Sequence, residues 1–261
     1  MGAFVFAKIL GPVLAFGTRW AKGRHSRTFG TAGLRGAAED EDHETVQFVR
    51  PYTMTSPERI RALCSAVRYI ENAGIEGAVV ECGVWRGGSM MAVARTLSNL
   101  GAADRDLYLF DTFEGMTEPG PHDVALSGET AKCLLEQSAR TEEDMVWCYA
   151  PLERVAQALA LTMYPKESIH LIPGRVEHTL ATAAPKSIAL LRLDTDWYES
   201  TRHEMEILFP RLCRGGVLII DDYGHWHGAR RAVDEYVAAH QLKLLLHPID
   251  YTGRIAVKAF D

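Results

Sequence analysis

The chain has 261 residues, of which 47% are hydrophobic and 24% charged, and its formal net charge is −6 at pH 7. This length and balance are typical of a globular protein with a substantial core, and they favour one main domain with an N-terminal extension. The mildly acidic charge provides no broad basic field for phosphates, so a nucleic-acid partner is not expected.

The N-terminal residues 3–16 are strongly apolar and precede a set of basic residues. The stretch is too short to span a bilayer, and Lys8 and Pro12 within it make a secretory signal a poor match. Its apolar spacing favours packing against a partner subunit, or disorder, over contact with a membrane surface. Residues 30–44 predict a mobile link, so we expect an extension and linker over residues 1–49 and a catalytic domain over residues 50–261.

Beyond residue 50, strand-like and helix-like stretches alternate, which is typical of a doubly wound α/β domain. A Ser-Pro pair at residues 56–57 predicts the start of a helix that runs to about residue 73. The predicted strands cover residues 78–81, 107–111, 168–172, 188–194, 217–221, 243–247 and 255–259. Further amphipathic helices are predicted over residues 88–100, 152–163, 198–212 and 229–240.

The first predicted strand runs into a glycine-rich turn, Gly83-x-x-x-Gly87-Gly88, that opens the next helix. Glycines let the backbone approach a ligand closely, and free N–H groups at a helix start favour a carboxylate or phosphate. The spacing lacks the Gly-x-Gly-x-x-Gly of dinucleotide folds, and the acid Glu81 suits a cationic amino group better than a pyrophosphate. The turn points to S-adenosylmethionine, although a tight turn without a ligand has the same pattern.

Residues 115–140 form an insertion that is longer than an ordinary connection, so they are either a lid or a plain surface loop. Asp111 ends the strand before this insertion, where a carboxylate can accept hydrogen bonds from both ribose hydroxyls. We therefore expect a cofactor that contains adenosine.

Pairs of acids lie at the carboxyl ends of two later strands: Asp194 and Asp196 at one, and Asp221 and Asp222 at the other. Ligands bind at this carboxyl edge of an open α/β sheet. Carboxylates this close raise one another's pKa, so a compensating divalent cation is expected, and their oxygens suit Mg²⁺ or Mn²⁺. Alternatively, one of the later acids caps the next element and faces solvent.

His225 and His227 follow the second acid pair with a His-x-His spacing, which can indicate zinc. Their neighbours are rich in oxygen and include no thiolate, so zinc is the poorer match. A base or substrate-facing role for either histidine, or a solvated loop, stays open. The five cysteines are scattered and never form Cys-x-x-Cys pairs, which favours reduced thiols and a cytoplasmic location.

The last two predicted strands are joined by too few residues for a crossover helix, so they must form an antiparallel hairpin. Seven strands with one reversed at the end are the pattern of class I methyltransferases. Nicotinamide-binding domains usually finish with a parallel strand, so a nicotinamide oxidoreductase fits less well.

Four motifs follow one another along the chain. They are Glu81-Cys82-Gly83-Val84-Trp85-Arg86-Gly87-Gly88-Ser89, Phe110-Asp111-Thr112-Phe113-Glu114-Gly115-Met116, Leu193-Asp194-x-Asp196-x-Tyr198-Glu199-Ser200-Thr201 and Gly215-Gly216-x-x-Ile219-Ile220-Asp221-Asp222-Tyr223. Together they resemble the macrocin O-methyltransferase family. The resemblance implies a Rossmann-like, seven-stranded class I methyltransferase fold with an N-terminal helical extension. It also implies a metal-dependent homo-oligomer that methylates hydroxyls on sugars of glycosylated antibiotics, glycolipids or polysaccharides.

The resemblance also implies the site residues. The Mg²⁺ ligands would be Asp194, Asp221 and Asp222. The S-adenosylmethionine contacts would be Met54, Glu81, Gly83 and Ser89, then Asp111, Thr112 and Phe113 along the adenosine, and Val176 and Glu177 near the adenine. The family pattern usually reads Leu-Asp-Gly-Asp, whereas Thr195 replaces the glycine here.

Methyl transfer from a sulfonium is an in-line displacement that needs a well-oriented oxygen nucleophile and a general base. Asp194 is the first candidate for this base because it could contact metal and substrate together; Asp196 is the second, and His225 stays a candidate. A catechol or other phenol could replace the sugar hydroxyl with the same cofactor and metal. A non-catalytic binding module fits less well, because it would have no use for the acids beside the turn.

Overall fold

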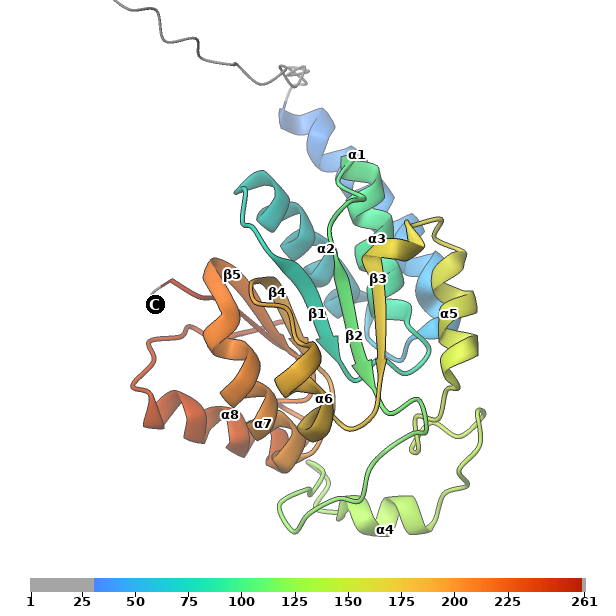
Figure 1. The fold of residues 1–261 in the computed structure, drawn as a ribbon, viewed down its shortest axis with the longest axis vertical. Coiled ribbons are helices and arrows are strands. Elements are labelled where there is room, and N and C mark those ends of the chain that lie inside the picture. The colour runs from blue at the N-terminus through green and yellow to red at the C-terminus, as the bar shows by residue number, and fades with distance from the viewer. Residues whose placement is uncertain (1–30, 260–261) are drawn as a thin grey trace, which may run out of the picture.

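The computed structural model describes residues 31–259, in which a seven-stranded sheet lies between two layers of helices (Figure 1). The strands are β1 (Ala78–Cys82), β2 (Leu107–Asp111), β3 (Ile169–Pro173), β4 (Ile188–Leu193), β5 (Leu212–Ile220), β6 (His247–Pro248) and β7 (Arg254–Val257). Their order in the sheet is β3-β2-β1-β4-β5-β7-β6. The first five strands pair in parallel, and β7 is antiparallel to both β5 and β6. This single reversed strand confirms the predicted class I methyltransferase fold and its terminal hairpin.

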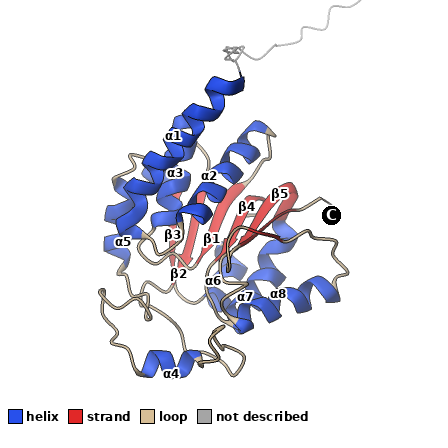
Figure 2. Cartoon of the chain, turned by 180° about the vertical axis from the view of Figure 1, so that it is seen from behind, coloured by secondary structure: helices blue, strands red, loops and turns tan. Residues whose placement is uncertain are grey.

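Helices cover both faces of the sheet, as the front and back views show (Figures 1 and 2). One layer contains α1 (Thr31–Val49), α2 (Pro57–Asn72), α3 (Gly88–Leu100) and α5 (Leu152–Ala160), and the other contains α6 (Val176–Ala183), α7 (Tyr198–Leu208) and α8 (His227–Ala239). The short helix α4 (Ala131–Glu136) lies in the long connection after β2, and Ala131 and Leu135 share a small hydrophobic cluster with Ala229 of α8. Single 3-10 turns occupy Arg50–Tyr52, Lys166–Ser168 and Phe209–Arg211.

Side chains from alternate positions of the strands fill the two interfaces between sheet and helices. One core cluster includes Val79, Leu107, Leu109, Leu190, Val217 and Ile219 and packs against α2, α3 and α5. The other includes Val80, Leu191, Leu193, Leu218 and Ile220 and packs against α6, α7 and α8. A strand that is buried on both faces needs apolar residues at nearly every position, which explains the continuous apolar runs in the sequence. Glu81 in β1 and Arg192 in β4 are charged and nevertheless buried.

The N-terminal link differs from the prediction. Helix α1 begins at Thr31, inside the stretch that was expected to be a mobile link, so that expectation is wrong for these residues. Val46 and Val49 near the end of α1 are buried in the core beside α3, and this packing supports a helix that its composition does not indicate. The predictions for residues 3–16 and the basic residues that follow fall outside the described residues.

Two helices and one strand also differ from the prediction. Helices α4 and α6 were not predicted, and the expected strand over residues 243–247 shrinks to His247–Pro248. The leucines before His247 pack against the core without pairing to β7: Leu242, Leu244 and Leu246. Within residues 31–259, no helix combines the length and apolar character needed to cross a membrane.

Candidate active site

The carboxyl ends of β1, β4 and β5 bring three predicted metal ligands together. Asp194 follows β4, and Asp221 and Asp222 follow β5. The backbone N–H of Asp194 donates to the carbonyl of Cys82 at 2.8 Å, and that of Asp221 donates to the carbonyl of Leu193 at 2.9 Å. These bonds continue the strand pairing just past the strand ends and fix the acids side by side. One carboxylate oxygen from each of the three acids lies within 4.8 Å of the others.

Arg192 lies beneath these acids with a side chain that is only 2% exposed. Its Nη1 donates to Oε1 of Glu81 at 2.7 Å and to Oδ2 of Asp194 at 2.6 Å. Its Nη2 donates to Oδ1 of Asp221 at 2.6 Å and to the hydroxyl of Thr55 at 3.0 Å. Arg192 was not among the predicted site residues, although an arginine inside an apolar strand, two positions before Asp194, was a usable signal. One buried guanidinium thus compensates three carboxylates.

Arg59 on α2 provides a second positive charge. Its Nη1 donates to Oδ2 of Asp221, and its Nε forms an ion pair with Oδ2 of Asp250 at 3.0 Å. Ser56, the N-cap of α2, donates to the same oxygen of Asp250 at 2.7 Å and accepts the backbone N–H of Arg59 at 3.2 Å. Both oxygens of Asp221 are therefore paired with guanidinium groups. The compensation that the sequence assigned to a divalent cation alone is partly provided by the protein itself.

The acids still outnumber the arginines, and this imbalance fits a divalent cation. Burial raises the pKa of Asp194 and of Asp222 well above the usual range, and the neighbouring carboxylates add to the effect. The Oδ2 atom of Asp222 is buried and has no hydrogen-bond partner. An unpartnered carboxylate oxygen beside other hard oxygen donors is a suitable ligand set for Mg²⁺ or Mn²⁺.

Asp196 lies in a turn with unusual backbone geometry. Its φ is 68°, in the left-handed region that costs a non-glycine residue about 1 kcal/mol or more. Burial raises the pKa of its carboxyl group to about 7. The preceding residue, Thr195, donates from its hydroxyl to Oε1 of Glu204 at 2.9 Å, and Glu204 is completely buried on α7. The threonine that replaces the family glycine thus ties this turn to the helix behind it.

The glycine-rich turn lies directly beside Asp194. Gly83 has a φ of 82°, and a Cβ at this position would lie 2.0 Å from the backbone oxygen of Asp194. Only glycine fits such an approach. Ser89 is buried in the first turn of α3. A Cβ on Gly88 would lie 2.7 Å from Cβ of Thr53, so the segment that carries Met54 passes over the start of α3. The structure therefore gathers these predicted cofactor residues around one turn.

Asp111 holds the glycine-rich turn through its backbone. Its Oδ2 accepts the N–H groups of Val84 at 2.6 Å and Trp85 at 3.1 Å, and its Oδ1 accepts that of Phe113 at 2.7 Å. This carboxylate was predicted to bind ribose hydroxyls, and its role in the turn was not predicted. A carboxylate has about four acceptor sites, so a ribose contact is compatible with these three bonds and stays a prediction.

The other predicted adenosine contacts lie next to the end of β2. The hydroxyl of Thr112 donates to the carbonyl of Gly115 at 2.7 Å. Val176 begins α6 and is buried, and Glu177 follows it. The loop before α6 is tied to β2, because the N–H of Gly174 donates to the carbonyl of Asp111 at 2.9 Å. Their contacts with adenosine also stay predictions.

The long connection after β2 crosses the edge of the sheet, where α4 lies beyond the ends of β1 and β2 (Figure 1). Asp123 anchors it, because its buried carboxylate accepts the N–H of Tyr198 at 2.7 Å at the start of α7. Further along, the N–H of Leu126 donates to the carbonyl of His225 at 2.8 Å. The insertion is thus bound to the loop that follows Asp222, and its role as a lid stays a prediction.

The two histidines lie in different surroundings. His225 is partly buried, and its Nδ1 lies 3.5 Å from the hydroxyl of Tyr251. Burial and the nearby charge of Arg59 lower the pKa of His225, which favours the neutral imidazole. His227 is exposed at the start of α8, and the group of acids that could hold a metal does not include it.

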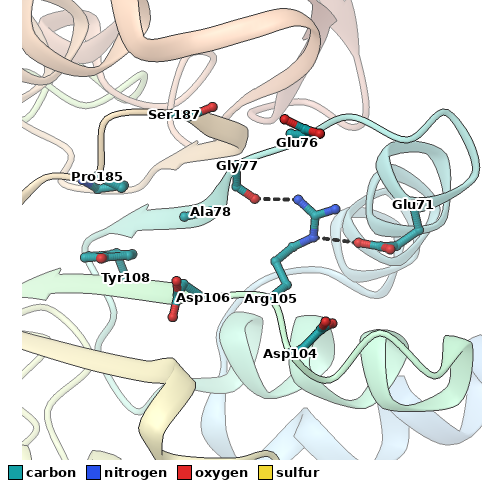
Figure 3. A pocket seen from close by; sticks show the side chains of 10 residues that line it. All are labelled: Glu71, Glu76, Gly77, Ala78, Asp104, Arg105, Asp106, Tyr108, Pro185 and Ser187. Atoms are coloured by element: carbon teal, nitrogen blue, oxygen red, sulfur yellow. Dashed lines mark hydrogen bonds and ion pairs between the residues drawn. The ribbon is translucent and has the colours of Figure 1, made fainter. Parts of the chain in front are cut away.

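A separate pocket of about 410 Å³ lies at the opposite edge of the sheet, where β1 and β2 begin (Figure 3). Arg105 is the central cation there, and its Nε donates to Oε1 of Glu71 at 2.5 Å. It also donates to the carbonyl of Gly77. The pocket shares no lining residue with the acid cluster, so it is distinct from the candidate active site.

The family model and the similar proteins agree on one family for this chain. Residues 24–257 match the model of the family described as macrocin-O-methyltransferase (TylF). Over 202 residues the chain is 34% identical to 8-demethyl-8-(2,3-dimethoxy-alpha-L-rhamnosyl)-tetracenomycin-C 4'-O-methyltransferase of Streptomyces olivaceus, covering 77% of this chain and 74% of that protein. Over 213 residues it is 29% identical to mycinamicin III 3''-O-methyltransferase of Micromonospora griseorubida, covering 82% of this chain and 79% of that protein.

Solved structures show the same arrangement. The O-methyltransferase NovP matches with a TM-score of 0.69 and 28% identity, covering 80% of this chain and 83% of that one. The calicheamicin methyltransferase CalS11 matches with a TM-score of 0.58 at 16% identity, covering 92% of this chain and 99% of that one, which is a likeness of fold.

Proposed function

Because this chain belongs to the macrocin O-methyltransferase family, we propose that it transfers a methyl group from S-adenosylmethionine to a sugar hydroxyl of a glycosylated small molecule. The family match over residues 24–257 is the observation that carries methyl transfer to oxygen. The class of acceptor is supported by relatives that are named for a rhamnosyl tetracenomycin and for mycinamicin III.

Asp194, Asp221 and Asp222 would hold a divalent cation, which we take to be Mg²⁺. Their convergence within 4.8 Å and the unpartnered Oδ2 of Asp222 support this proposal. When bound, S-adenosylmethionine supplies the methyl group on a sulfonium, and Mg²⁺ orients the acceptor and lowers the pKa of its hydroxyl.

The methionine end of the cofactor would lie at the glycine-rich turn. Glu81 is 1% exposed, and its Oε1 is paired with Arg192, whereas its Oε2 is buried without a partner. A buried carboxylate oxygen without a donor is costly, and an ammonium group would satisfy it. The N–H groups at the start of α3 suit the carboxylate of the same ligand. These features support the contacts of Glu81, Gly83 and Ser89 that the sequence predicted.

For the general base we now favour Asp196 over Asp194. Arg192 donates a hydrogen bond to Asp194 at 2.6 Å, which opposes the rise that burial causes in the pKa of this acid, and a cation on the other oxygen would lower that pKa further. Asp196 follows two residues later and has no arginine partner in the described part of the chain. Burial raises its pKa to about 7, which suits a base that works near neutral pH.

A direct test supplies isotopically labelled S-adenosylmethionine to the purified chain, together with separate panels of glycosides and of catechols, in Mg²⁺. We expect mass spectrometry to locate the labelled methyl group on a sugar oxygen. Methylation of the catechols alone would contradict the proposed acceptor class, and the absence of transfer to any oxygen in cell extracts would contradict the activity.

A further inference from the structure

Asp221 differs from the other two proposed metal ligands because both of its oxygens are paired with arginines. Arg192 takes Oδ1 and Arg59 takes Oδ2. Asp194 is paired through one oxygen, and Asp222 has an oxygen without a partner. A divalent cation that uses all three acids would therefore meet a guanidinium on each oxygen of Asp221.

The two arginines differ in how firmly they are held. Arg192 is 2% exposed and bonds four groups, contributed by β1, Thr55 and the loops after β4 and β5. Withdrawing it would leave Glu81 and Asp194 buried without compensation, which is costly. Arg59 is 12% exposed at the rim, on the first turn of α2. If Arg59 releases Asp221, its Nε still pairs with Asp250 at 3.0 Å.

We propose that Arg59 is an exchangeable counter-ion, which neutralises Asp221 in the metal-free protein and gives up that carboxylate oxygen when the divalent cation binds. Arg192 is the permanent counter-ion of the same cluster. This inference rests on the proposed metal site and adds a competition to it: the Arg59–Asp221 pair and the bound metal exclude one another. The physical reason is that two cations compete for one oxygen at a distance where like charges repel strongly.

The competition predicts the sign of an effect on metal affinity. Arg59→Met removes the charge and keeps an apolar stem, so the metal-stripped full-length variant should bind Mn²⁺ about tenfold more tightly than the wild type. Free Mn²⁺ is measured by electron paramagnetic resonance during a titration without cofactor or acceptor. Arg68→Met is the matched control: Arg68 lies on the same helix and pairs with Asp42 at 2.6 Å, away from the acids. Its Mn²⁺ affinity should equal that of the wild type.

Thermal unfolding provides a second readout. Without metal, Arg59→Met should melt below the wild type because Oδ2 of Asp221 loses its partner, and saturating Mn²⁺ should remove most of that difference. Should the methionine variant fail to fold, Arg59→Lys keeps one charge but cannot serve Asp221 and Asp250 together. Its Mn²⁺ affinity should then be tighter than that of the wild type.

An unchanged or weaker Mn²⁺ affinity in the folded Arg59 variants would overturn the exchange, because Arg59 would then position Asp221 for the metal and not compete with it. If the wild type binds no Mn²⁺ at all, the proposed metal site itself is contradicted. The exchange then has no basis either.

Discussion

The Nη1 atom of Arg192 lies 2.6 Å from Oδ2 of Asp194, and the same nitrogen lies 2.7 Å from Oε1 of Glu81. One side chain of β4 thus joins the acid proposed for the cofactor to an acid proposed for the metal. The two halves of the site share a buried counter-ion, so a change at Arg192 should alter both.

Replacing Arg192 with Met should destabilise the fold by about 3–5 kcal/mol, because it leaves buried carboxylates without their partner. Urea unfolding with and without Mg²⁺ measures the effect, and Mg²⁺ should recover part of the loss. Arg202→Met is a control, since Arg202 pairs with Glu199 and Glu206 on the surface and should change stability little. Equal stabilities of the two variants would contradict the role of Arg192.

Replacing Asp111 with Ala should affect the turn as well as the cofactor. Three backbone N–H groups lose their acceptor, so we expect a loss of about 1–3 kcal/mol in the free energy of unfolding. Calorimetric titration should also show weaker binding of S-adenosylhomocysteine. If the variant keeps full stability, the hydrogen bonds to the turn are unimportant, and if it keeps full affinity, the ribose contact is absent.

Gly83→Ala should disturb the position of Asp194. The added Cβ would meet the backbone oxygen of Asp194 at 2.0 Å, and φ is 82° at this glycine. Gly101→Ala is the matched control, because Gly101 has a φ of 70° but nothing within 4 Å of its added Cβ. Melting temperatures should fall more for Gly83→Ala, and only this variant should lose affinity for Mn²⁺. If both variants lost the same amount of melting temperature and of Mn²⁺ affinity, the positive φ alone would explain why glycine is needed at position 83.

Asp196→Asn and Asp194→Asn separate the general base from the metal ligand. Removing the base should lower kcat by about 10²-fold or more at saturating Mg²⁺, and we expect this for Asp196→Asn. Asp194→Asn should instead weaken metal binding, so that raised Mg²⁺ recovers part of its turnover. Steady-state rates over a range of Mg²⁺ concentrations check both. If Asp196→Asn kept near-normal turnover, and Asp194→Asn lost turnover that raised Mg²⁺ did not recover, Asp194 would be the general base.

The sequence was sufficient to predict where the acids meet. Apolar runs identified the strands, and acids at the ends of neighbouring parallel strands must lie at one edge, so Asp194, Asp196, Asp221 and Asp222 could be grouped from the sequence. The family resemblance then implied which three of them bind the metal. The antiparallel hairpin followed from the shortness of one connection, because no crossover helix fits into it.

The counter-ions of these acids could not be found in the same way. Arg59 lies on a helix far away in the sequence, and its contact with Asp221 depends on how α2 packs across the sheet edge. Nothing in its local sequence separates it from Arg68, which lies on the same helix but pairs with Asp42 on α1. The backbone contacts of Asp111 were missed for a similar reason, since side-chain bonds to a turn leave no pattern of residue types.

Chelator dependence of methyl transfer by the wild-type chain is the most direct test that the acid cluster holds a metal needed for catalysis. With an identified acceptor and saturating S-adenosylmethionine, excess EDTA should abolish turnover, and Mg²⁺ added beyond the chelator should restore it. Full turnover in excess EDTA would contradict the metal site, and the acids of β4 and β5 would then serve with Arg59 and Arg192 as a purely ionic framework.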